Sequence, residues 1–149
     1  MTGSNHVVAG AIIAASVSQP AIAIPAALAS HFVMDALPHY GDNTGRSWFS
    51  RHFHVILAID AVICMVFLLS LIILQPANWL LLIICGAIAV SPDFLWLPYY
   101  LADLKGQVRH ESPLARLFKW IQWGERPWGI YIEIAWLIAS LGIFLAIVR

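Results

Sequence analysis

The sequence predicts an all-α membrane protein, a polytopic bundle of about five transmembrane helices with one short amphipathic helix at the membrane interface. Of its 149 residues, 61% are hydrophobic and only 11% are charged, and the mean hydropathy is +0.82. These values lie outside the range of soluble domains and inside that of membrane proteins. The length allows one compact bundle, so we expect a single integral membrane domain over residues 1–149.

Five apolar stretches predict the helices of the bundle. They cover residues 5–18, 21–37, 54–74, 79–96 and 127–148. At 1.5 Å per residue the third and the fifth reach about 30 Å, enough for the hydrocarbon core, whereas the first reaches only about 21 Å. The connectors "SQP" and "QPAN" are so short that the first two helices, and the next two, should form antiparallel hairpins.

Basic residues predict the orientation in the membrane. Seven of the eight Lys and Arg residues fall in the two polar loops, namely Arg46, Arg51, Lys105, Arg109, Arg116, Lys119 and Arg126. With five spans both loops lie on one side, which the positive-inside rule makes cytoplasmic. We therefore expect an inner or cytoplasmic membrane protein with its N-terminus inside and its C-terminus outside. The net charge is zero, which gives no field favouring nucleic acid as a partner.

The second loop contains a candidate interfacial helix, "SPLARLFKWIQW", over residues 112–123. Ser112 suits an N-cap and Pro113 suits the first helical position. Apolar residues then recur at i, i+3, i+4 and i+7 from Leu114, opposite Arg116 and Lys119. This pattern is typical of an amphipathic helix lying on the membrane, and a helix packed against the bundle is the alternative.

Ionisable side chains gather at the cytoplasmic ends of the predicted helices. The candidates for function are His6, His31, Asp35, His39, Asp60, Asp93 and Glu133. A carboxylate inside a membrane costs about 2.5 to 3.5 kcal/mol on insertion scales, so such a residue indicates function by default.

The segment "SHFVMDALPH" carries the clearest pattern. His31 and Asp35 are one helical turn apart and share a face. Pro38 should end the helix near Leu37, so that His39 folds back from the loop. Two imidazoles and one carboxylate in this spacing predict a divalent-metal site with a position left for water, and zinc suits it best, with manganese or iron as alternatives.

Two further residues on the same predicted membrane face extend this metal site. His6 begins the first helix and Asp93 follows Pro92 near the end of the fourth. The alternatives are an interfacial histidine and an ordinary helix-end carboxylate. Both residues nevertheless lie where ligands to the same ion would be expected.

Three short segments resemble a known family. "NHVVAGAII", "SHFVMDALPH" and "SPDFLW" are similar to segments of the small integral-membrane metal-dependent hydrolases, the family of the LexA-regulated inner-membrane hydrolase. The second segment also resembles, more faintly, the His-x-x-x-Asp helix of zinc-dependent phospholipase C. The resemblance covers about the first forty residues and a patch near residue 93. It implies a metal site formed by His6, His31, Asp35 and Asp93, to which the spacing adds His39.

Two features of that family are missing here. Its members often carry a Pro-Asp-x-Asp segment and a His-Ser pair between the early helices, and neither follows the first helix of this sequence.

These observations together predict a metal-dependent hydrolase at the cytoplasmic face, acting on a lipid or another amphiphilic phosphoester. Asp60 or Glu133 would accept a proton as the catalytic residue. For Asp60, a hydrogen bond to a neighbouring helix, a ligand role or a supporting role beside the metal ligands stays open. For Glu133, a ligand role or a pair with Arg126 stays open. Membrane lipids are the expected partners, because basic residues of the interfacial segment suit anionic headgroups.

Two other classes of function stay open, as does the oligomeric state. One is a non-catalytic membrane protein that binds or conducts a cation or a proton. The other is a structural bundle in which each polar group pairs with a neighbour. The outer halves of the predicted helices lack ionisable groups, which disfavours a path across the membrane.

Overall fold

The computed structural model describes residues 1–41, 51–106, 112–113, 116–117, 120 and 122–148. In chain order its elements are α1 (Gly3–Ser16), α2 (Pro20–Asp35), β1 (His39–Tyr40), α3 (Arg51–Leu74), α4 (Trp79–Val90), the 3-10 helix η2 (Ser91–Trp96), α5 (Leu97–Leu104), the 3-10 helix η3 (Gln122–Gly124), β2 (Glu125–Arg126) and α7 (Gly129–Val148). The fold is mostly helical, as the sequence predicts. Of the twelve residues of the predicted interfacial helix, 112–123, five lie outside the described residues, namely 114, 115, 118, 119 and 121.

Three helical segments are long and apolar enough to cross a membrane, which is consistent with an integral membrane protein. They are Arg51–Leu74, Trp79–Leu104 and Gly129–Val148. The two remaining helices, α1 and α2, have 14 and 16 residues and reach about 21 and 24 Å, short of a hydrocarbon core of about 30 Å. Length and composition therefore support three of the five predicted spans.

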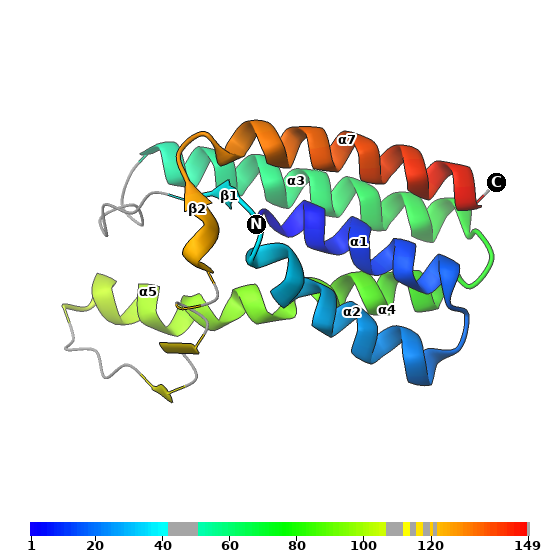
Figure 1. The fold of residues 1–149 in the computed structure, drawn as a ribbon, viewed down its shortest axis with the longest axis horizontal. Coiled ribbons are helices and arrows are strands. Elements are labelled where there is room, and N and C mark those ends of the chain that lie inside the picture. The colour runs from blue at the N-terminus through cyan, green and yellow to red at the C-terminus, as the bar shows by residue number, and fades with distance from the viewer. Residues whose placement is uncertain (42–50, 107–111, 114–115, 118–119, 121, 149) are drawn as a thin grey trace.

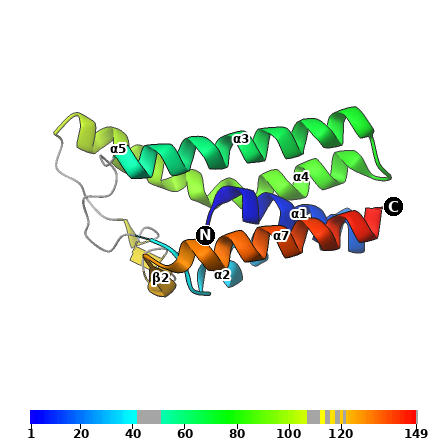
Figure 2. The ribbon, with the colours of Figure 1, turned by 90° about the horizontal axis from the view of Figure 1, so that it is seen from above.

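Helix α1 occupies the middle of the bundle (Figures 1 and 2). It packs against α2, α3, α4 and α7, and eight of its 14 residues are buried, the polar Ser4, Asn5 and His6 among them. Because neighbouring helices cover it, α1 can begin with polar side chains that lipid would not tolerate. This arrangement places the start of α1 inside the protein.

Glycines allow α1 and α4 to approach closely. A Cβ atom at Gly10 would lie 2.4 Å from the carbonyl oxygen of Cys85, and one at Gly86 would lie 3.0 Å from the carbonyl oxygen of Val7. Small residues at such crossings are the usual means of packing helices tightly in membranes. The crossing fixes α1 against the end of α4, where the site lies.

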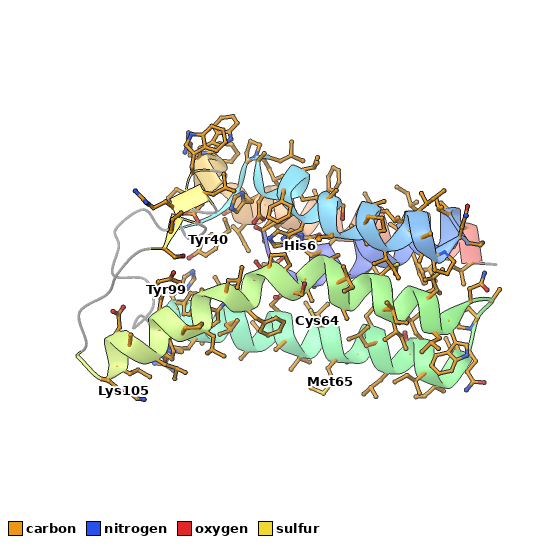
Figure 3. All side chains as sticks on the ribbon, turned by 90° about the horizontal axis from the view of Figure 1, so that it is seen from below. His6, Tyr40, Cys64, Met65, Tyr99 and Lys105 are labelled. Carbon is orange, nitrogen blue, oxygen red and sulfur yellow. The ribbon has the colours of Figure 1, made fainter. Side chains whose placement is uncertain are left out.

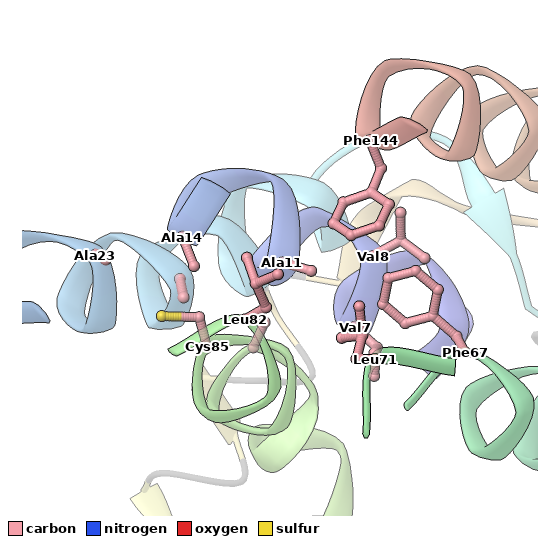
Figure 4. Close-up of a cluster of buried hydrophobic side chains, with 12 residues drawn as sticks. Val7, Val8, Ala11, Ala14, Ala23, Phe67, Leu71, Leu82, Cys85 and Phe144 are labelled. Atoms are coloured by element: carbon pink, nitrogen blue, oxygen red, sulfur yellow. The ribbon is translucent and has the colours of Figure 1, made fainter. Parts of the chain in front are cut away.

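The apolar core fills the space between α1 and the longer helices (Figure 4). Val7 and Val8 of α1 are buried beside Phe67 of α3 and Phe144 of α7. The two aromatic rings meet edge to face, with 5.2 Å between their centroids, an arrangement that their quadrupoles favour. This aromatic pair lies farther along the bundle axis than the polar residues that begin α1.

Two predicted helix ends differ from the structure, and one strand pairing was not predicted. The fourth helix continues beyond residue 96 to Leu104, because the chain passes Pro92 by switching to the 3-10 helix η2 rather than by ending. Helix α2 ends at Asp35, two residues before the predicted end. The chain then enters β1, which pairs in parallel with β2, His39 opposite Glu125, a pairing that the sequence did not predict.

Candidate metal centre

Four of the predicted ligands converge at one point inside the protein. His6 comes from α1, His31 and Asp35 from α2, and Asp93 from η2. Each contributes one ligand atom, and these atoms lie within 4.8 Å of one another. His6, His31 and Asp35 are at most 3% exposed, whereas 24% of the side chain of Asp93 is exposed. In Figure 3, His6 lies in the interior while Met65 points outward from α3.

The spacing of the four side chains fits a metal ion. Asp35 lies 3.1 Å from His6 and 3.3 Å from His31, each measured to the imidazole Nε2 atom. Asp93 lies 4.0 and 3.9 Å from the same two nitrogens. Ligands 2.0 to 2.2 Å from a tetrahedral ion are separated by about 3.4 Å. The group therefore needs only small shifts to surround an ion.

A backbone carbonyl fixes the tautomer of His31. The Nδ1 atom of His31 donates a hydrogen bond to the carbonyl oxygen of Ala89 in α4, at 2.9 Å. Its Nε2 atom then carries the lone pair, and this atom faces Asp35 and Asp93. Histidine ligands in metal sites are commonly oriented in this way by a second hydrogen bond.

Pro92 explains the positions of the Ala89 carbonyl and of Asp93. Proline has no N–H to donate to the carbonyl four residues earlier, that of Ile88, and the hydroxyl of Ser91 donates to it instead, at 2.9 Å. The switch to η2 takes the following carbonyls out of the regular α-helical pattern. It thereby presents the Ala89 carbonyl and Asp93 to the same site.

Unbalanced polarity at the site also fits a cation. The Met1 amino group and the His6 Nε2 atom both lie against Asp35 Oδ1. Among the described residues, His6 Nδ1 and Asn5 Oδ1 are buried and have no hydrogen-bond partner. Two carboxylates this close to each other are costly to bury unless positive charge balances them. The Met1 amino group supplies one such charge beside Asp35, and a divalent ion would balance both carboxylates.

His39, the fifth predicted ligand, is not part of this group. It is buried, and its Nδ1 atom donates to the carbonyl oxygen of Leu37 at 2.7 Å. Burial lowers the pKa of His39 below its ordinary value. The early end of α2 and the pairing of β1 with β2 explain why this side chain turns elsewhere.

The two predicted catalytic carboxylates contact the backbone at the start of α1. Asp60 accepts hydrogen bonds from the N–H groups of Gly3 and Ser4. Glu133 accepts from the N–H groups of Thr2 and Tyr40. Their role as proton acceptors stays a prediction. Through these hydrogen bonds both carboxylates contact the start of α1, the helix that carries His6.

Sequence reasoning missed the residues that support the ligands. The carbonyl of Ala89 and the hydroxyl of Ser91 could not be identified from residue types. The sequence did contain one indication of them, a proline inside an apolar run long enough to span a membrane.

Comparisons with known proteins add no family assignment. No family model matches the chain, and neither the curated proteins nor the solved structures compared with it gave a match.

Proposed function

We propose that this chain is an integral membrane protein that binds a divalent metal ion through His6, His31, Asp35 and Asp93. The observation that carries the proposal is the convergence of four ligand atoms from three separate elements within 4.8 Å. A simple ion pair joins one imidazole to one carboxylate. Here the Nε2 atoms of both imidazoles face the same two carboxylates. Two nitrogen and two oxygen ligands suit zinc, with manganese or iron as alternatives.

The proposed activity is hydrolysis. A bound ion of this kind lowers the pKa of water and polarises a phosphoryl or carbonyl oxygen. Asp93 is the most exposed of the four ligands, so its side of the site is where a substrate would enter. His31 and Asp35 hold the buried side, where α2 and α4 exclude water.

The proposed substrate is a lipid or another amphiphilic phosphoester. Glu133, which contacts the start of α1, lies about 6 Å along α7 from its first residue. The site is therefore close to one end of an apolar helix, at the depth where headgroups begin. The basic residues of the two loops support a cytoplasmic location for that end.

Binding or conduction of a cation or a proton without catalysis is the second candidate. The same buried carboxylates and imidazoles favour it, because such groups also build ion paths. A path must cross the bilayer, however, and residues 7–30, 61–92 and 134–148 contain no Asp, Glu, His, Lys or Arg. Hydrolysis at one face therefore accounts better for the distribution of charge.

Elemental analysis of the detergent-purified protein tests the proposal. We expect close to one equivalent of zinc, manganese or iron in the wild type and none in His31→Ala or Asp35→Ala. His54→Ala is the matched control, because His54 is exposed and contacts Tyr100 rather than the site. A wild type that is free of metal and cannot be reloaded would contradict the proposal. Loaded protein would then be assayed against phosphoesters with and without acyl chains.

A further inference from the structure

We propose that Asp60 and Glu133 are positioning residues that hold the start of α1, and through it His6, in the geometry that binds the ion. This inference rests on the proposed metal function and identifies the backbone N–H groups through which these two carboxylates would act.

Asp60 reaches from α3 to the first turn of α1. Its Oδ2 atom accepts the N–H of Gly3 at 2.8 Å, and its Oδ1 atom accepts the N–H of Ser4 at 2.9 Å. A Cβ atom at Gly3 would lie 3.0 Å from both Asp60 Oδ2 and Val90 Cγ2. The absence of a side chain at Gly3 therefore permits the close approach of α1 to α3 and α4.

Glu133 makes the corresponding contacts from α7. Its Oε2 atom accepts the N–H of Thr2 at 3.2 Å, and its Oε1 atom accepts the N–H of Tyr40 at 3.0 Å. Its backbone carbonyl accepts from the side-chain amide of Asn5 at 3.3 Å. Glu133 thus ties the start of α1 to α7 and to β1.

The start of α1 needs these two carboxylates. The first N–H groups of a helix have no partner within it, and a buried helix end requires one. The N-cap residue Thr2 makes no capping hydrogen bond with its side chain, and the first turn contains no acidic residue. Asp60 and Glu133 supply the missing acceptors from other helices, and their negative charge also suits the positive end of the helix dipole.

His6 is the ligand that depends on this arrangement. It lies two residues after Ser4, and its Nε2 atom must stay near Asp35 Oδ1, now 3.1 Å away. No partner among the described residues holds its Nδ1 atom, in contrast to His31. The orientation of His6 therefore depends on the placement of its backbone.

The test measures zinc affinity in Asp60→Asn and Glu133→Gln by competition with a chromogenic chelator. Each variant keeps the shape but replaces one acceptor oxygen by an NH2 group facing an N–H. We expect a 10- to 100-fold weaker affinity, the usual effect of losing a group that orients a ligand. Cobalt-loaded samples should also show altered d–d absorption, because the His6 nitrogen is displaced from the ion.

Phe144→Ala is the control for destabilisation alone. Phe144 is buried against Phe67, 11 residues beyond Glu133 on α7, so its loss should lower thermal stability and leave the zinc affinity unchanged. If Phe144→Ala weakened zinc binding as much as Asp60→Asn does, the effect would reflect stability and the inference would fail.

A backbone variant tests the same contact from the donor side. Thr2 has a φ angle of −63°, which proline also adopts, so Thr2→Pro removes the N–H that Glu133 accepts without forcing the backbone. Thr2→Val removes the hydroxyl and keeps the N–H. We expect zinc affinity to fall further in Thr2→Pro than in Thr2→Val, and equal affinities would contradict the role of Glu133.

Failure of the two proposals is distinguishable. A wild type that binds no metal would overturn the proposed function. A wild type that binds zinc, together with unchanged affinity in both Asp60→Asn and Glu133→Gln, would overturn the positioning role alone.

Discussion

The imidazole of His31 donates from Nδ1 to the backbone carbonyl of Ala89 across the contact between α2 and α4, at 2.9 Å. Ala89 lies two residues before the 3-10 helix that begins at Ser91 and carries Asp93. One irregularity in the backbone of this spanning segment therefore supports both an imidazole and a carboxylate of the candidate site. Pro92, the residue after Ser91, accounts for that irregularity.

Replacing Pro92 should weaken metal binding without weakening the fold. In Pro92→Ala the regular α-helix can continue, and each residue then turns about 100° rather than the 120° of a 3-10 helix. The side chain at position 93 would rotate away from His6 and His31. We expect zinc affinity to fall at least about tenfold, the smallest effect usual when a group that orients a metal ligand is lost. The melting temperature should stay the same or rise, because alanine favours the helix more than proline does.

Zinc titration and thermal melting of the same samples check this prediction, with Pro76→Ala in the turn between α3 and α4 as the control. Full zinc affinity in Pro92→Ala would show that the helix switch is not needed for the site.

Metal binding should weaken below neutral pH, because imidazole binds metals only in its neutral form. Burial lowers the pKa of His6 to about 4, whereas the pKa of His31 is raised, since burial there is outweighed by the contacts with Asp35 and Asp93. Between pH 7.5 and 5.5 acid therefore competes with the ion for His31 rather than for His6, at a cost of up to about a tenfold fall in affinity per pH unit. Zinc affinity measured at pH 7.5, 6.5 and 5.5 should fall toward acid pH, and a flat profile would exclude His31 as a ligand.

Residue spacing and topology were enough to predict the four clustered residues. His31 and Asp35 share a helix face at i, i+4, a relation that any regular helix imposes. His6 and Asp93 were expected nearby because alternating helices bring their ends to one membrane face. These relations depend only on periodicity and chain direction, which the sequence contains.

Contacts between side chains and backbone could not be predicted in this way. Depth in a helix placed Asp60 and Glu133 near the site, but it does not specify which N–H groups they face. His39 was predicted as a ligand from its four-residue spacing. The helix ends at Asp35, and β1 pairs with a strand more than 80 residues later, which local spacing cannot anticipate.

Helix lengths were also only partly predictable. Hydropathy predicted α1 as one of five apolar helices, although its predicted reach of about 21 Å fell short of the hydrocarbon core. The structure places α1 in the interior, packed against four other helices. A buried helix and a spanning helix have similar composition, and only tertiary packing separates them.

Acidic pH should destabilise the fold through His39. Burial lowers the pKa of His39 in the folded state, so the unfolded chain binds the proton more readily. Stability is then fully present above the unfolded pKa of about 6.5 and is lost as the pH falls below it. In His39→Gln, which cannot be protonated, we expect a smaller drop in melting temperature between pH 8 and pH 5.5 than in the wild type.

Metal chelator in every sample removes the contribution of ion binding from that comparison, and His54→Gln is the exposed control. An equal drop in wild type and His39→Gln would show that His39 does not contribute to the pH dependence of stability.

The contact between α1 and α4 should tolerate no side chain at Gly10. A Cβ atom there would lie 2.4 Å from the carbonyl oxygen of Cys85, whereas one at Gly142 in α7 would meet nothing within 4 Å. Gly10→Ala should destabilise the protein by about 1 to 3 kcal/mol, since two backbones must separate. Gly142→Ala should stabilise it by up to about 1 kcal/mol, because alanine favours the helix. If the melting temperatures of both variants shifted in the same direction, this would contradict the close approach of α1 and α4.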